Sequence, residues 1–349
     1  MEQGNSDKAN RVISYLGDHR THLELRNVPH PSAGELLLSM RVSGLCGTDL
    51  FKLENDSAIP GSVLGHEIVG EIIAVGEGEN RFKTGDRVVV PHHVPCGSCL
   101  YCKRGNETMC RQFRDNLLEP GGFAEKILVR SRAASVAVHR LPESVSDEAA
   151  VFMEPAGCVL RGIQRSGIGQ EGLAVIQGAG SMGLLHLLVL RVFYPDLQVL
   201  VVDPLKDRQE LAIQLGAHGA TDPGSGALDV TSEYSEGTGA DVIFDTVGGS
   251  DLLNAGLHLC REGGTVVLFA HAAHEAQASF DLNEVFKFEK RILGTYSGTL
   301  KEQAEIFKAI TSGSLDPTPL VSHRFSLDRF DEAVDLARNR NALKILLCP

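Results

Sequence analysis

The pattern of hydrophobic and polar residues changes near residue 155. Before this point, short runs of Val and Ile are separated by Gly, Pro and Asp. Short strands with frequent turn residues between them predict a β-rich, barrel-like domain. The clearest strands are expected at Ile68–Val75, Arg87–Val90 and Phe123–Val129.

From Gly172 onward, buried hydrophobic runs alternate with helical patterns. Strands are expected at Leu173–Gln177, Gln198–Val202, Asp241–Phe244, Gly264–Phe269 and Arg291–Gly294, and helices at Met182–Phe193 and around Asp207–Leu215 and Leu252–Cys260. This alternation predicts an α/β domain with a parallel, doubly wound sheet. After about residue 298, two amphipathic helices (Lys301–Thr311 and Leu327–Arg338) and a closing strand (Leu343–Leu347) are expected. The pattern alone does not show to which of the two domains these C-terminal residues belong.

Composition limits the classes of partner. The 349 residues favour two or three domains. Lys and Arg number 33 and Asp and Glu 45, so the net charge is −12. An excess of negative charge argues against nucleic acid and anionic membranes as partners. No apolar run approaches the roughly 20 residues of a membrane helix, and the polar start lacks the apolar stretch of a secretory signal. We therefore expect a soluble, cytoplasmic protein.

Four of the eight cysteines lie within fifteen residues: Cys96, Cys99, Cys102 and Cys110. Thiolates at these spacings can surround a zinc ion tetrahedrally, whereas consecutive disulfides at such short intervals would be strained. Four protein ligands leave no open coordination position, so this spacing predicts a structural zinc. An iron–sulfur or redox site is the alternative, and nothing nearby in the sequence suggests a path for electrons.

A Gly-x-Gly-x-x-Gly motif follows the predicted strand at Leu173–Gln177 and opens a predicted helix. Such a turn lets the backbone approach a pyrophosphate at the positive end of the helix. An aspartate that ends the next strand is placed to accept hydrogen bonds from a ribose, which favours NAD over NADP. A nearby arginine leaves NADP open. The predicted cofactor residues are Gly178, Gly180, Ser181, Met182, Gly183, Asp203 and Arg208.

Three dispersed segments offer the ligand types of a catalytic zinc. They are Cys46-Gly47-Thr48-Asp49, Gly65-His66-Glu67 and Glu154-Pro155. Each alone is unremarkable, since a lone Cys or His is usually structural. Together they supply one thiolate, one imidazole and two carboxylates, a set typical of zinc with an exchangeable water.

In this order, the segments resemble the zinc-dependent medium-chain dehydrogenase/reductase family over essentially the whole chain. The polyol branch (sorbitol, threonine and galactitol-phosphate dehydrogenases) is most similar, because Glu154 stands where simple alcohol dehydrogenases often have a second cysteine. The resemblance implies that Cys46, His66 and Glu67 are zinc-site residues, and that Glu154 binds zinc directly or through its water. It also implies a dimer or tetramer.

The resemblance further implies a GroES-like catalytic domain at residues 1–155 and a Rossmann NAD-binding domain at 156–297. Residues 298–349 would return to the catalytic domain. The expected reaction is hydride transfer between NAD and a secondary alcohol of a polyol, sugar alcohol or cyclitol, a small-molecule substrate. Zinc lowers the pKa of a bound hydroxyl, and the family pattern places Thr48 to take the hydroxyl proton.

The sequence departs from the family at one position. Phe51 stands where many relatives have a histidine that passes the proton onward, so this chain needs another exit. Phe51 and Lys52 are expected to line the pocket. Lys52 would bind a polar or anionic group of the substrate, or else is a solvated surface lysine.

Three alternatives remain open at this point. An NADPH-dependent carbonyl or alkene reductase of the same fold is disfavoured by the two apparent zinc sites. A non-catalytic binding module is disfavoured by the intact Cys46, His66 and Glu67. A four-cysteine nucleic-acid finger is disfavoured by the negative net charge.

Overall fold

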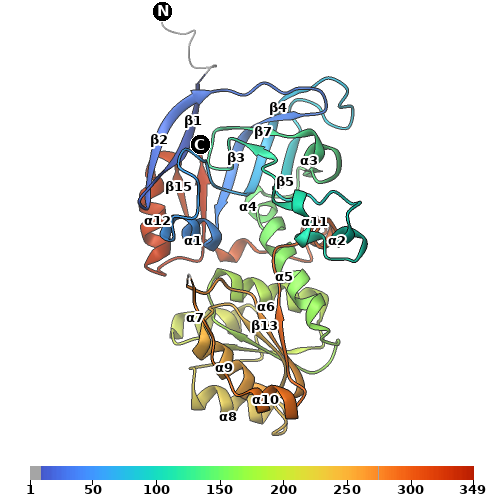
Figure 1. The fold of residues 1–349 in the computed structure, drawn as a ribbon, viewed down its shortest axis with the longest axis vertical. Coiled ribbons are helices and arrows are strands. Elements are labelled where there is room, and N and C mark those ends of the chain that lie inside the picture. The colour runs from blue at the N-terminus through green and yellow to red at the C-terminus, as the bar shows by residue number, and fades with distance from the viewer. Residues whose placement is uncertain (1–8, 274) are drawn as a thin grey trace, which may run out of the picture. The chain divides into compact units, whose positions relative to one another are not determined.

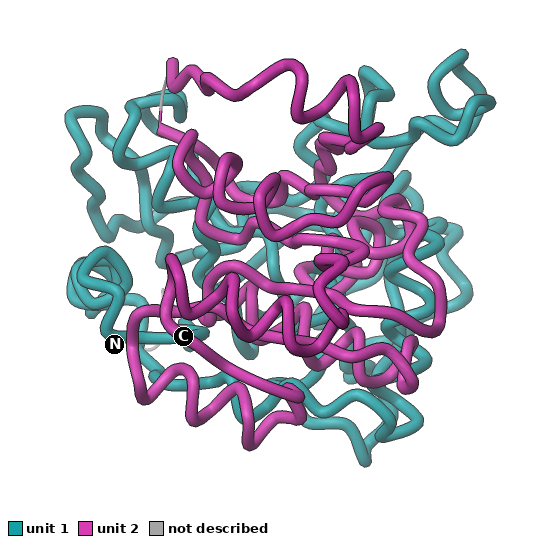
Figure 2. The backbone as a smooth tube through the Cα atoms, turned by 90° about the horizontal axis from the view of Figure 1, so that it is seen from below, with its two compact units in different colours: residues 1–154, 299–349 teal, residues 155–298 magenta. Residues whose placement is uncertain are grey.

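The computed structural model describes residues 9–273 and 275–349. The chain divides into two compact units (Figure 2). Unit 1 contains the residues up to Glu154 together with Thr299–Pro349, and unit 2 contains Pro155–Gly298. In the described residues, no helix combines the length and apolarity needed to cross a membrane.

Unit 1 is β-rich (Figure 1). In the described residues, its main sheet has eight strands: six in the order β15-β16-β3-β4-β5-β8, together with β7, which pairs with β3, and β6, which pairs with β7. The strands β1 and β2 form a separate antiparallel pair. The strands are β1 (Ala9–Gly17), β2 (Arg20–Asn27), β3 (Leu36–Leu45), β4 (Glu67–Val75), β5 (Arg87–Pro91), β6 (Leu118–Glu119), β7 (Lys126–Val129), β8 (His139–Arg140), β15 (Val321–Ser326) and β16 (Lys344–Cys348).

The central strand β3 joins distant parts of the chain. It pairs with β4 on one side and with β16 on the other, both antiparallel. Apolar residues of these strands and of the last helix, such as Leu36, Ile68, Phe330 and Leu347, are buried in one core. The helices of this unit are α1 (Gly47–Glu54), α2 (Leu100–Lys103), α3 (Ser131–Val136), α4 (Asp147–Ala150), α11 (Leu300–Thr311) and α12 (Phe330–Arg338).

Unit 2 contains a parallel sheet with the strand order β11-β10-β9-β12-β13-β14. Its strands are β9 (Leu173–Gln177), β10 (Gln198–Val202), β11 (Gly219–Thr221), β12 (Ala240–Asp245), β13 (Cys260–Leu268) and β14 (Arg291–Gly294). Its helices are α6 (Ser181–Phe193), α7 (Lys206–Gln214), α8 (Ser225–Tyr234), α9 (Ser250–Leu259) and α10 (Leu282–Lys287), preceded by α5 (Met153–Ser166). The predicted parallel, doubly wound sheet is confirmed.

The strand order of unit 2 reverses between β9 and β12. In sheets of this type, ligands bind beyond the carboxyl ends of the strands at the reversal. The glycine-rich turn follows β9 directly, so the topology places it at that point. All five residues of β9 are buried, as expected for a strand covered on both faces.

Some predicted boundaries were wrong. In the predicted segment Phe123–Val129, regular pairing begins only at Lys126. Cys260 was expected at the end of a helix, but it has an extended backbone and pairs with Ala240, so it begins β13. The predicted helix Leu327–Arg338 starts with a turn of 3₁₀ helix at Leu327–Arg329.

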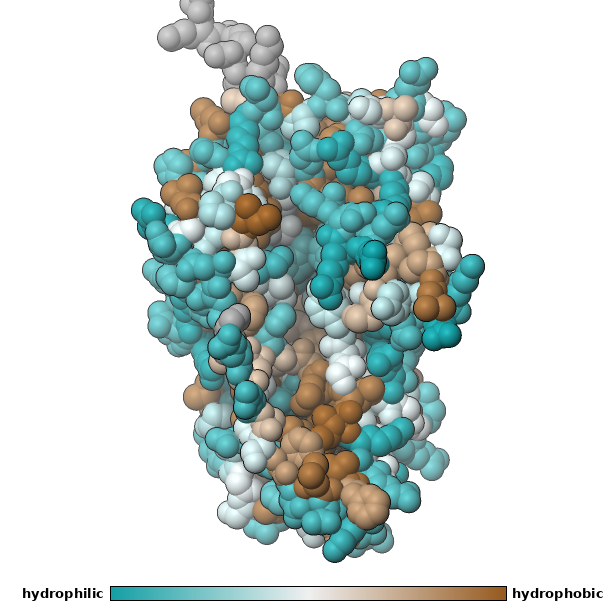
Figure 3. Space-filling view, in the orientation of Figure 1, coloured by the Kyte–Doolittle hydropathy of each residue, from teal (hydrophilic) through white to brown (hydrophobic). Residues whose placement is uncertain are grey.

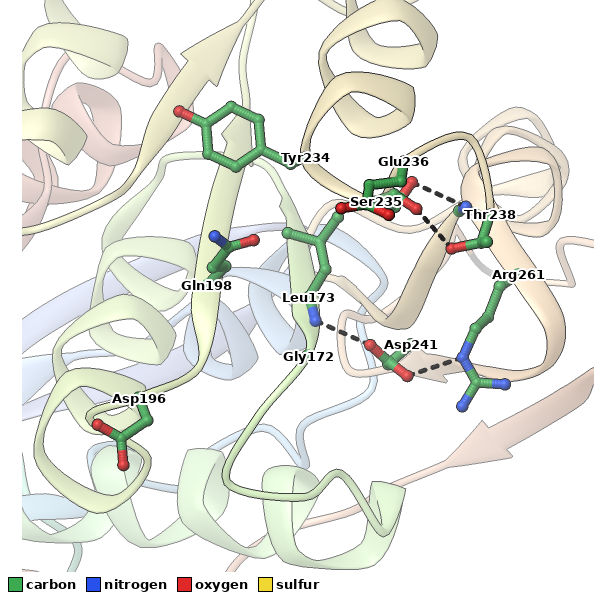
Figure 4. A pocket seen from close by; sticks show the side chains of 11 residues that line it. Gly172, Leu173, Asp196, Gln198, Tyr234, Ser235, Glu236, Thr238, Asp241 and Arg261 are labelled. Carbon is green, nitrogen blue, oxygen red and sulfur yellow. Dashed lines mark hydrogen bonds and ion pairs between the residues drawn. The ribbon is translucent and has the colours of Figure 1, made fainter.

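A pocket of about 420 Å³ lies at the amino ends of the strands of unit 2 (Figure 4). There the carboxylate of Asp241 accepts hydrogen bonds from the Leu173 backbone N–H (2.8 Å) and from Arg261 Nε (2.7 Å). These contacts tie the first residues of β9, β12 and β13 together. Asp241 and Arg261 therefore have a structural role, at the edge of the sheet opposite the glycine-rich turn.

Candidate functional site

Cys46, His66 and Glu67 come together where β3 ends and β4 begins. Cys46 follows the last residue of β3 and caps α1, and His66 immediately precedes β4. Because β3 and β4 are antiparallel neighbours, the end of one lies beside the start of the other. One potential ligand atom from each of the three residues lies within 4.8 Å of the other two. The structure thus brings together three of the four residues expected at the catalytic zinc.

Asp49 orients this set from the first turn of α1. Its Oδ2 accepts from the Cys46 backbone N–H at 3.1 Å, and its Oδ1 accepts from the Gly65 backbone N–H at 3.2 Å. Asp49 Oδ1 also lies 3.3 Å from His66 Nδ1. A carboxylate on one ring nitrogen holds an imidazole so that the other nitrogen faces a metal.

The electrostatics of this cluster suit a cation. Burial alone would lower the pKa of His66, but the charges of Asp49 and Cys46 raise it well above its usual value. The site therefore stabilises positive charge in a place where water contributes little. A thiolate, an imidazole and a nearby carboxylate are a set that fits zinc.

Glu67 is held by a lysine from the far end of the chain. Both of its carboxylate oxygens accept from Lys344 Nζ, at 2.8 and 2.6 Å. Burial lowers the pKa of Lys344, but the charges of Glu67, Cys46 and Glu154 together raise it above its usual value. Lys344 therefore stays charged although it is buried. Its role was missed from the sequence, because nothing in the sequence links two residues 277 positions apart.

Glu154 is buried and faces a histidine pair that sequence analysis missed. Its Oε1 lies 3.8 Å from His92 Nδ1. The rings of His66 and His92 have centroids 4.7 Å apart, and those of His92 and His93 3.5 Å apart. Glu154 lies outside the group formed by Cys46, His66 and Glu67. In the sequence, the only indication of this histidine pair was that His92 and His93 are adjacent and lie shortly before Cys96.

His92 and His93 are neutral bases. Burial lowers the pKa of His92 well below its usual value, and burial with nearby positive charge lowers that of His93 to about 3. Lys52, on α1, contributes to both shifts, so its charge lies near the two imidazoles. Thr48, Phe51 and Lys52 are half-buried on the first two turns of α1.

The four clustered cysteines form a second group of potential ligands in unit 1, and their sulfur atoms lie within 4.8 Å of one another. Cys102 Sγ lies 3.5 Å from Cys99 Sγ and 3.9 Å from Cys96 Sγ. All four are free thiols. Sulfurs about 2.3 Å from one tetrahedral zinc are roughly 3.8 Å apart, so these separations suit a metal and are far too long for disulfides.

The thiols of the four clustered cysteines differ in their pKa values. The backbone N–H and hydroxyl of Ser98 lower the pKa of Cys96 to about 6. Burial and the neighbouring Cys99 raise the pKa of Cys102 to about 12. Thiolates so close together repel one another, and a dication at their centre would remove that repulsion. The donor set therefore fits a structural zinc.

The glycine-rich turn of unit 2 has the shape of a nucleotide cradle. Gly178 has a φ of +96°, a conformation that favours glycine. A Cβ on Gly183 would lie 1.8 Å from the Gly178 carbonyl oxygen, so glycine is needed for packing. A Cβ on Gly180 would meet nothing, which leaves open space beside the N-terminus of α6. The Ser181 hydroxyl is buried there and has no partner among the described residues.

Asp203 lies beside this turn, after the end of β10. One carboxylate oxygen accepts from the Ala179 backbone N–H (2.7 Å) and the other from the Leu205 backbone N–H (2.9 Å). The two contacts fix the carboxylate against the glycine-rich turn. Met182 and Arg208 are half-buried, on α6 and at the start of α7. The turn, an unpartnered hydroxyl and a fixed carboxylate fit a dinucleotide.

The sequence matches two family models. Residues 32–143 match the alcohol dehydrogenase GroES-like domain, and residues 172–312 match the zinc-binding dehydrogenase domain. An L-threonine 3-dehydrogenase of Pectobacterium atrosepticum is 31% identical over 333 residues, which cover 93% of this chain and 90% of the relative. The chain belongs to the zinc-dependent medium-chain dehydrogenase family.

Other members of this dehydrogenase family are similar over the same extent. A sorbitol dehydrogenase of Halalkalibacterium halodurans is 27% identical over 94% of this chain and 96% of its own length. The acetophenone reductase of Geotrichum candidum, solved in complex with NAD, has a TM-score of 0.86 at 25% identity and covers 99% of both chains. These similarities confirm the predicted family and the assignment as an oxidoreductase.

Proposed function

We propose that this dehydrogenase interconverts a secondary alcohol of a polyol, sugar alcohol or cyclitol with the corresponding ketone, using zinc and NAD. The observation that carries the proposal is the cluster of Cys46, His66 and Glu67, with Glu154 nearby and Asp49 behind the histidine. The threonine and sorbitol dehydrogenases among its relatives support a hydroxylated substrate.

The proposed catalytic zinc uses Cys46 and His66, with the carboxylates of Glu67 and Glu154 beside it. Zinc, when bound, would make the hydroxyl group of the substrate more acidic, so that the hydroxyl can lose its proton and the carbon atom that bears it can give a hydride to NAD. The second zinc would be held by the four clustered cysteines and would stabilise a lobe that has few buried apolar residues.

We propose that residues of this chain accept the hydroxyl proton of the substrate and transfer it out of the site. Thr48, two residues after Cys46, would take the hydroxyl proton of the substrate and pass it on. Phe51 offers no acceptor, so the proton leaves by another route, through a ribose hydroxyl of the cofactor or past Glu67 or Glu154. Phe51 and Lys52 would line the pocket. The charge of Lys52 near His92 and His93 supports a polar substrate group at that end.

The proposed cofactor is NAD, bound by Gly178, Gly180, Ser181, Met182 and Gly183. Asp203 would accept hydrogen bonds from the adenosine ribose and would repel a 2′-phosphate. Arg208, five residues later, is the feature that would favour NADP instead. The fixed Asp203 carboxylate supports NAD.

We also propose a homodimer or homotetramer, as the family resemblance implies. In unit 2, β14 is an edge strand of the sheet. On neighbouring α10, Leu282 is 73% exposed and Phe286 is 79% exposed. Figure 3 shows hydrophobic side chains gathered over this region. An unpaired edge beside an apolar patch supports association of two copies.

We place the protein in the cytoplasm. All eight cysteines are free thiols, which is the usual state in a reducing compartment.

A substrate panel tests the proposed reaction. The purified protein would be incubated with polyols, cyclitols, L-threonine and simple primary alcohols, each with NAD and with NADP, while nicotinamide reduction is followed by absorbance. We expect secondary alcohols with NAD to react fastest. Faster reduction of ketones by NADPH would favour a carbonyl reductase. No turnover in either direction by a chain that contains two zinc ions would favour a binding protein.

A further inference from the structure

Two positively charged side chains of unit 1, Lys52 and Arg114, lie near a row of aromatic rings that begins at His66. We propose that these two side chains bind an anionic group of the substrate, so that the substrate is a hydroxylated compound that carries a carboxylate or a phosphate. The anionic group would lie at the end of the substrate remote from the reacting hydroxyl. This inference rests on the proposed function, because it concerns the substrate of the same site.

Lys52 lies one helical turn beyond Thr48 on α1. Asp49 and Leu53 form the buried face of this helix. Residues four apart on a helix share a face, and one turn advances about 5.4 Å along the axis. Thr48 and Lys52 therefore lie together on a second, half-buried face. A substrate with its reacting hydroxyl at Thr48 would have atoms several bonds away near Lys52.

No acid of α1 neutralises the charge of Lys52. The two acids of this helix contact other residues, since Asp49 lies 3.3 Å from His66 Nδ1 and Glu54 lies 3.5 Å from Arg338 Nε. In the described part of the chain, no carboxylate forms an ion pair with Lys52. A half-buried ammonium without a counter-charge attracts an anion more strongly than a fully solvated one does.

A row of rings leads from the proposed zinc site towards Arg114. After His66, His92 and His93, the row continues to Phe113, whose ring centroid lies 4.7 Å from that of His93. Phe113 is buried, and the next residue, Arg114, is exposed at the end of the 3₁₀ helix Arg111–Arg114. Arg114 therefore follows the last ring of the row, at the end remote from His66.

The pKa values of the two histidines in this row support the same placement of charge. Burial lowers both values most, and Lys52 lowers both further, whereas Arg114 contributes to the shift of His93. The Nδ1 atoms of His92 and His93 are buried and form no hydrogen bond with any described residue. This part of unit 1 thus combines positive charge with unsatisfied polar atoms, as a site for anionic oxygens requires.

The charge of the whole chain makes this local arrangement more informative. With a net charge of −12, the protein repels anions at long range. Two cations near the candidate zinc site act against that repulsion where the substrate would bind. Their position therefore favours an anionic substrate over a neutral one.

Three probes with the same six-carbon chain test the proposal: sorbitol, D-gluconate and sorbitol 6-phosphate. For the wild-type protein with NAD, we expect kcat/KM for at least one of the two anions to exceed that for sorbitol at least tenfold. The better anion identifies the group that binds. The difference should lie in KM and not in kcat, because a remote group contributes equally to binding of the ground state and of the transition state.

Variants connect this preference to the two cations. Lys52→Met should reduce the ratio of kcat/KM for the better anion to that for sorbitol at least tenfold. Lys52→Arg keeps the charge and should retain most of the ratio. Arg114→Gln should reduce the ratio by about threefold, because its side chain is exposed.

Lys83→Met is the matched control, since it changes the net charge by the same amount as Lys52→Met. Lys83 is exposed in the loop between β4 and β5, at the opposite end of β4 from Glu67. Its ratio should equal that of the wild type. Two results would overturn the proposal: a wild-type protein that prefers neither anion over sorbitol, and an unchanged preference in Lys52→Met.

Calorimetric titration of the purified protein with each probe measures binding without turnover, so it separates this proposal from the proposed reaction. An anion that is not oxidised, yet binds at least tenfold more weakly to Lys52→Met than to the wild type, contradicts the reaction and supports the anion site. Oxidation of sorbitol alone contradicts the anion site and supports the reaction. A wild-type protein that neither binds nor oxidises either anion also contradicts the anion site.

Discussion

The first turn of α1 carries Thr48, and the second carries Phe51, whose ring cannot accept a proton. Nearby, His92 and His93 are held neutral by burial and by the charge of Lys52. A hydroxyl can pass a proton only if it accepts one as it gives one away. The proposed proton transfer therefore depends on the Thr48 hydroxyl and on a proton acceptor other than Phe51.

Thr48→Val keeps the shape of the side chain and removes the hydroxyl. We expect kcat to fall by roughly 10²–10⁴-fold, as for the loss of a general acid–base step. Thr48→Ser, which retains a hydroxyl, should keep most of the activity. Phe51→His should add an ionisation near pH 6.5 to the pH–rate profile. Wild-type turnover in Thr48→Val would remove Thr48 from the mechanism.

Asp203 supplies both charge and hydrogen-bond acceptors to the proposed ribose site. Asp203→Ala should reduce the preference for NAD over NADP by roughly tenfold to a hundredfold, since hydrogen bonds to a charged group contribute about 1.5–3 kcal/mol. Asp203→Asn keeps one acceptor oxygen, so it separates the effect of charge from that of hydrogen bonding. The ratio of kcat/KM values for the two cofactors measures both. A wild-type protein that already prefers NADP would contradict this role.

Among the elements, the turn between β9 and α6 shows how two glycines of one motif serve different needs. At Gly183 a side chain would collide with the Gly178 carbonyl, so the fold requires glycine. At Gly180 a side chain would project into open space. The backbone of Gly180 is extended, with a φ of −72°, so any residue can adopt it. The fold therefore does not require glycine at position 180, and we propose that this glycine serves the cofactor instead.

The two glycines give opposite expectations for alanine variants. Gly180→Ala should fold with a wild-type Tm and should bind NADH at least tenfold more weakly, because the methyl group would take up space that we propose for the pyrophosphate. Gly183→Ala should lower the Tm or the yield of folded protein. NADH titration by fluorescence and thermal unfolding distinguish these effects. Equal NADH affinity in Gly180→Ala and the wild type would place the nucleotide elsewhere.

Sequence patterns predicted the elements of unit 2 well, because buried parallel strands are continuous apolar runs. Leu173–Gln177, Gln198–Val202 and Arg291–Gly294 were predicted with the bounds that the structure has. The helix Met153–Ser166 was missed, because Pro155 and Gly157 resemble breakers. Proline is compatible with the first turn of a helix, where its missing N–H has no partner to lose.

The sequence predicted the site residues that lie in local motifs. It did not predict the contacts that depend on residues far apart in the chain. Cys46 and His66 lie in recognisable segments, and the structure brings them together. Lys344 contacts Glu67 only because β16 pairs with β3, a pairing that no local pattern specifies. The same limit explains why the histidine pair beside Glu154 was overlooked.

At the scale of the whole molecule, the two zinc sites have different consequences. The proposed catalytic zinc joins the ends of strands that already pair, so the fold exists without it. The four-cysteine lobe consists of short helices with few buried residues. A metal that holds such a lobe contributes directly to its folding free energy.

Two cysteine variants test this difference. Cys99→Ser should lose one zinc per chain and fold in lower yield. Cys46→Ser should also lose one zinc, but it should keep its Tm and lose all dehydrogenase activity. Elemental analysis, thermal unfolding and turnover are the measurements. One zinc per wild-type chain, together with activity in Cys46→Ser, would contradict the assignment of both sites.

Acid should destabilise unit 2 through one buried histidine. His186 lies on α6 between the rings of Phe244 and Phe269, with its Nδ1 2.7 Å from the Met182 carbonyl oxygen. Burial lowers its pKa from 6.5 to about 4. The unfolded chain therefore takes up a proton at a higher pH than the folded chain does. Stability is fully present above pH 6.5 and is lost as the pH falls towards 4.

The loss should reach roughly 2 kcal/mol at pH 5, which corresponds to a Tm lower by roughly 5 °C. His186→Leu fills the same apolar site without a titrating group. Between pH 7.5 and pH 5, the decrease in its Tm should therefore be smaller than the decrease in the wild-type Tm by roughly 5 °C. His258→Gln, on the exposed face of α9, is the matched control and should behave as the wild type does. Zinc loss in acid affects all three proteins alike, so the difference isolates His186. Equal acid sensitivity of His186→Leu and the wild type would show that this histidine is already protonated, or is exposed to water, in the folded protein.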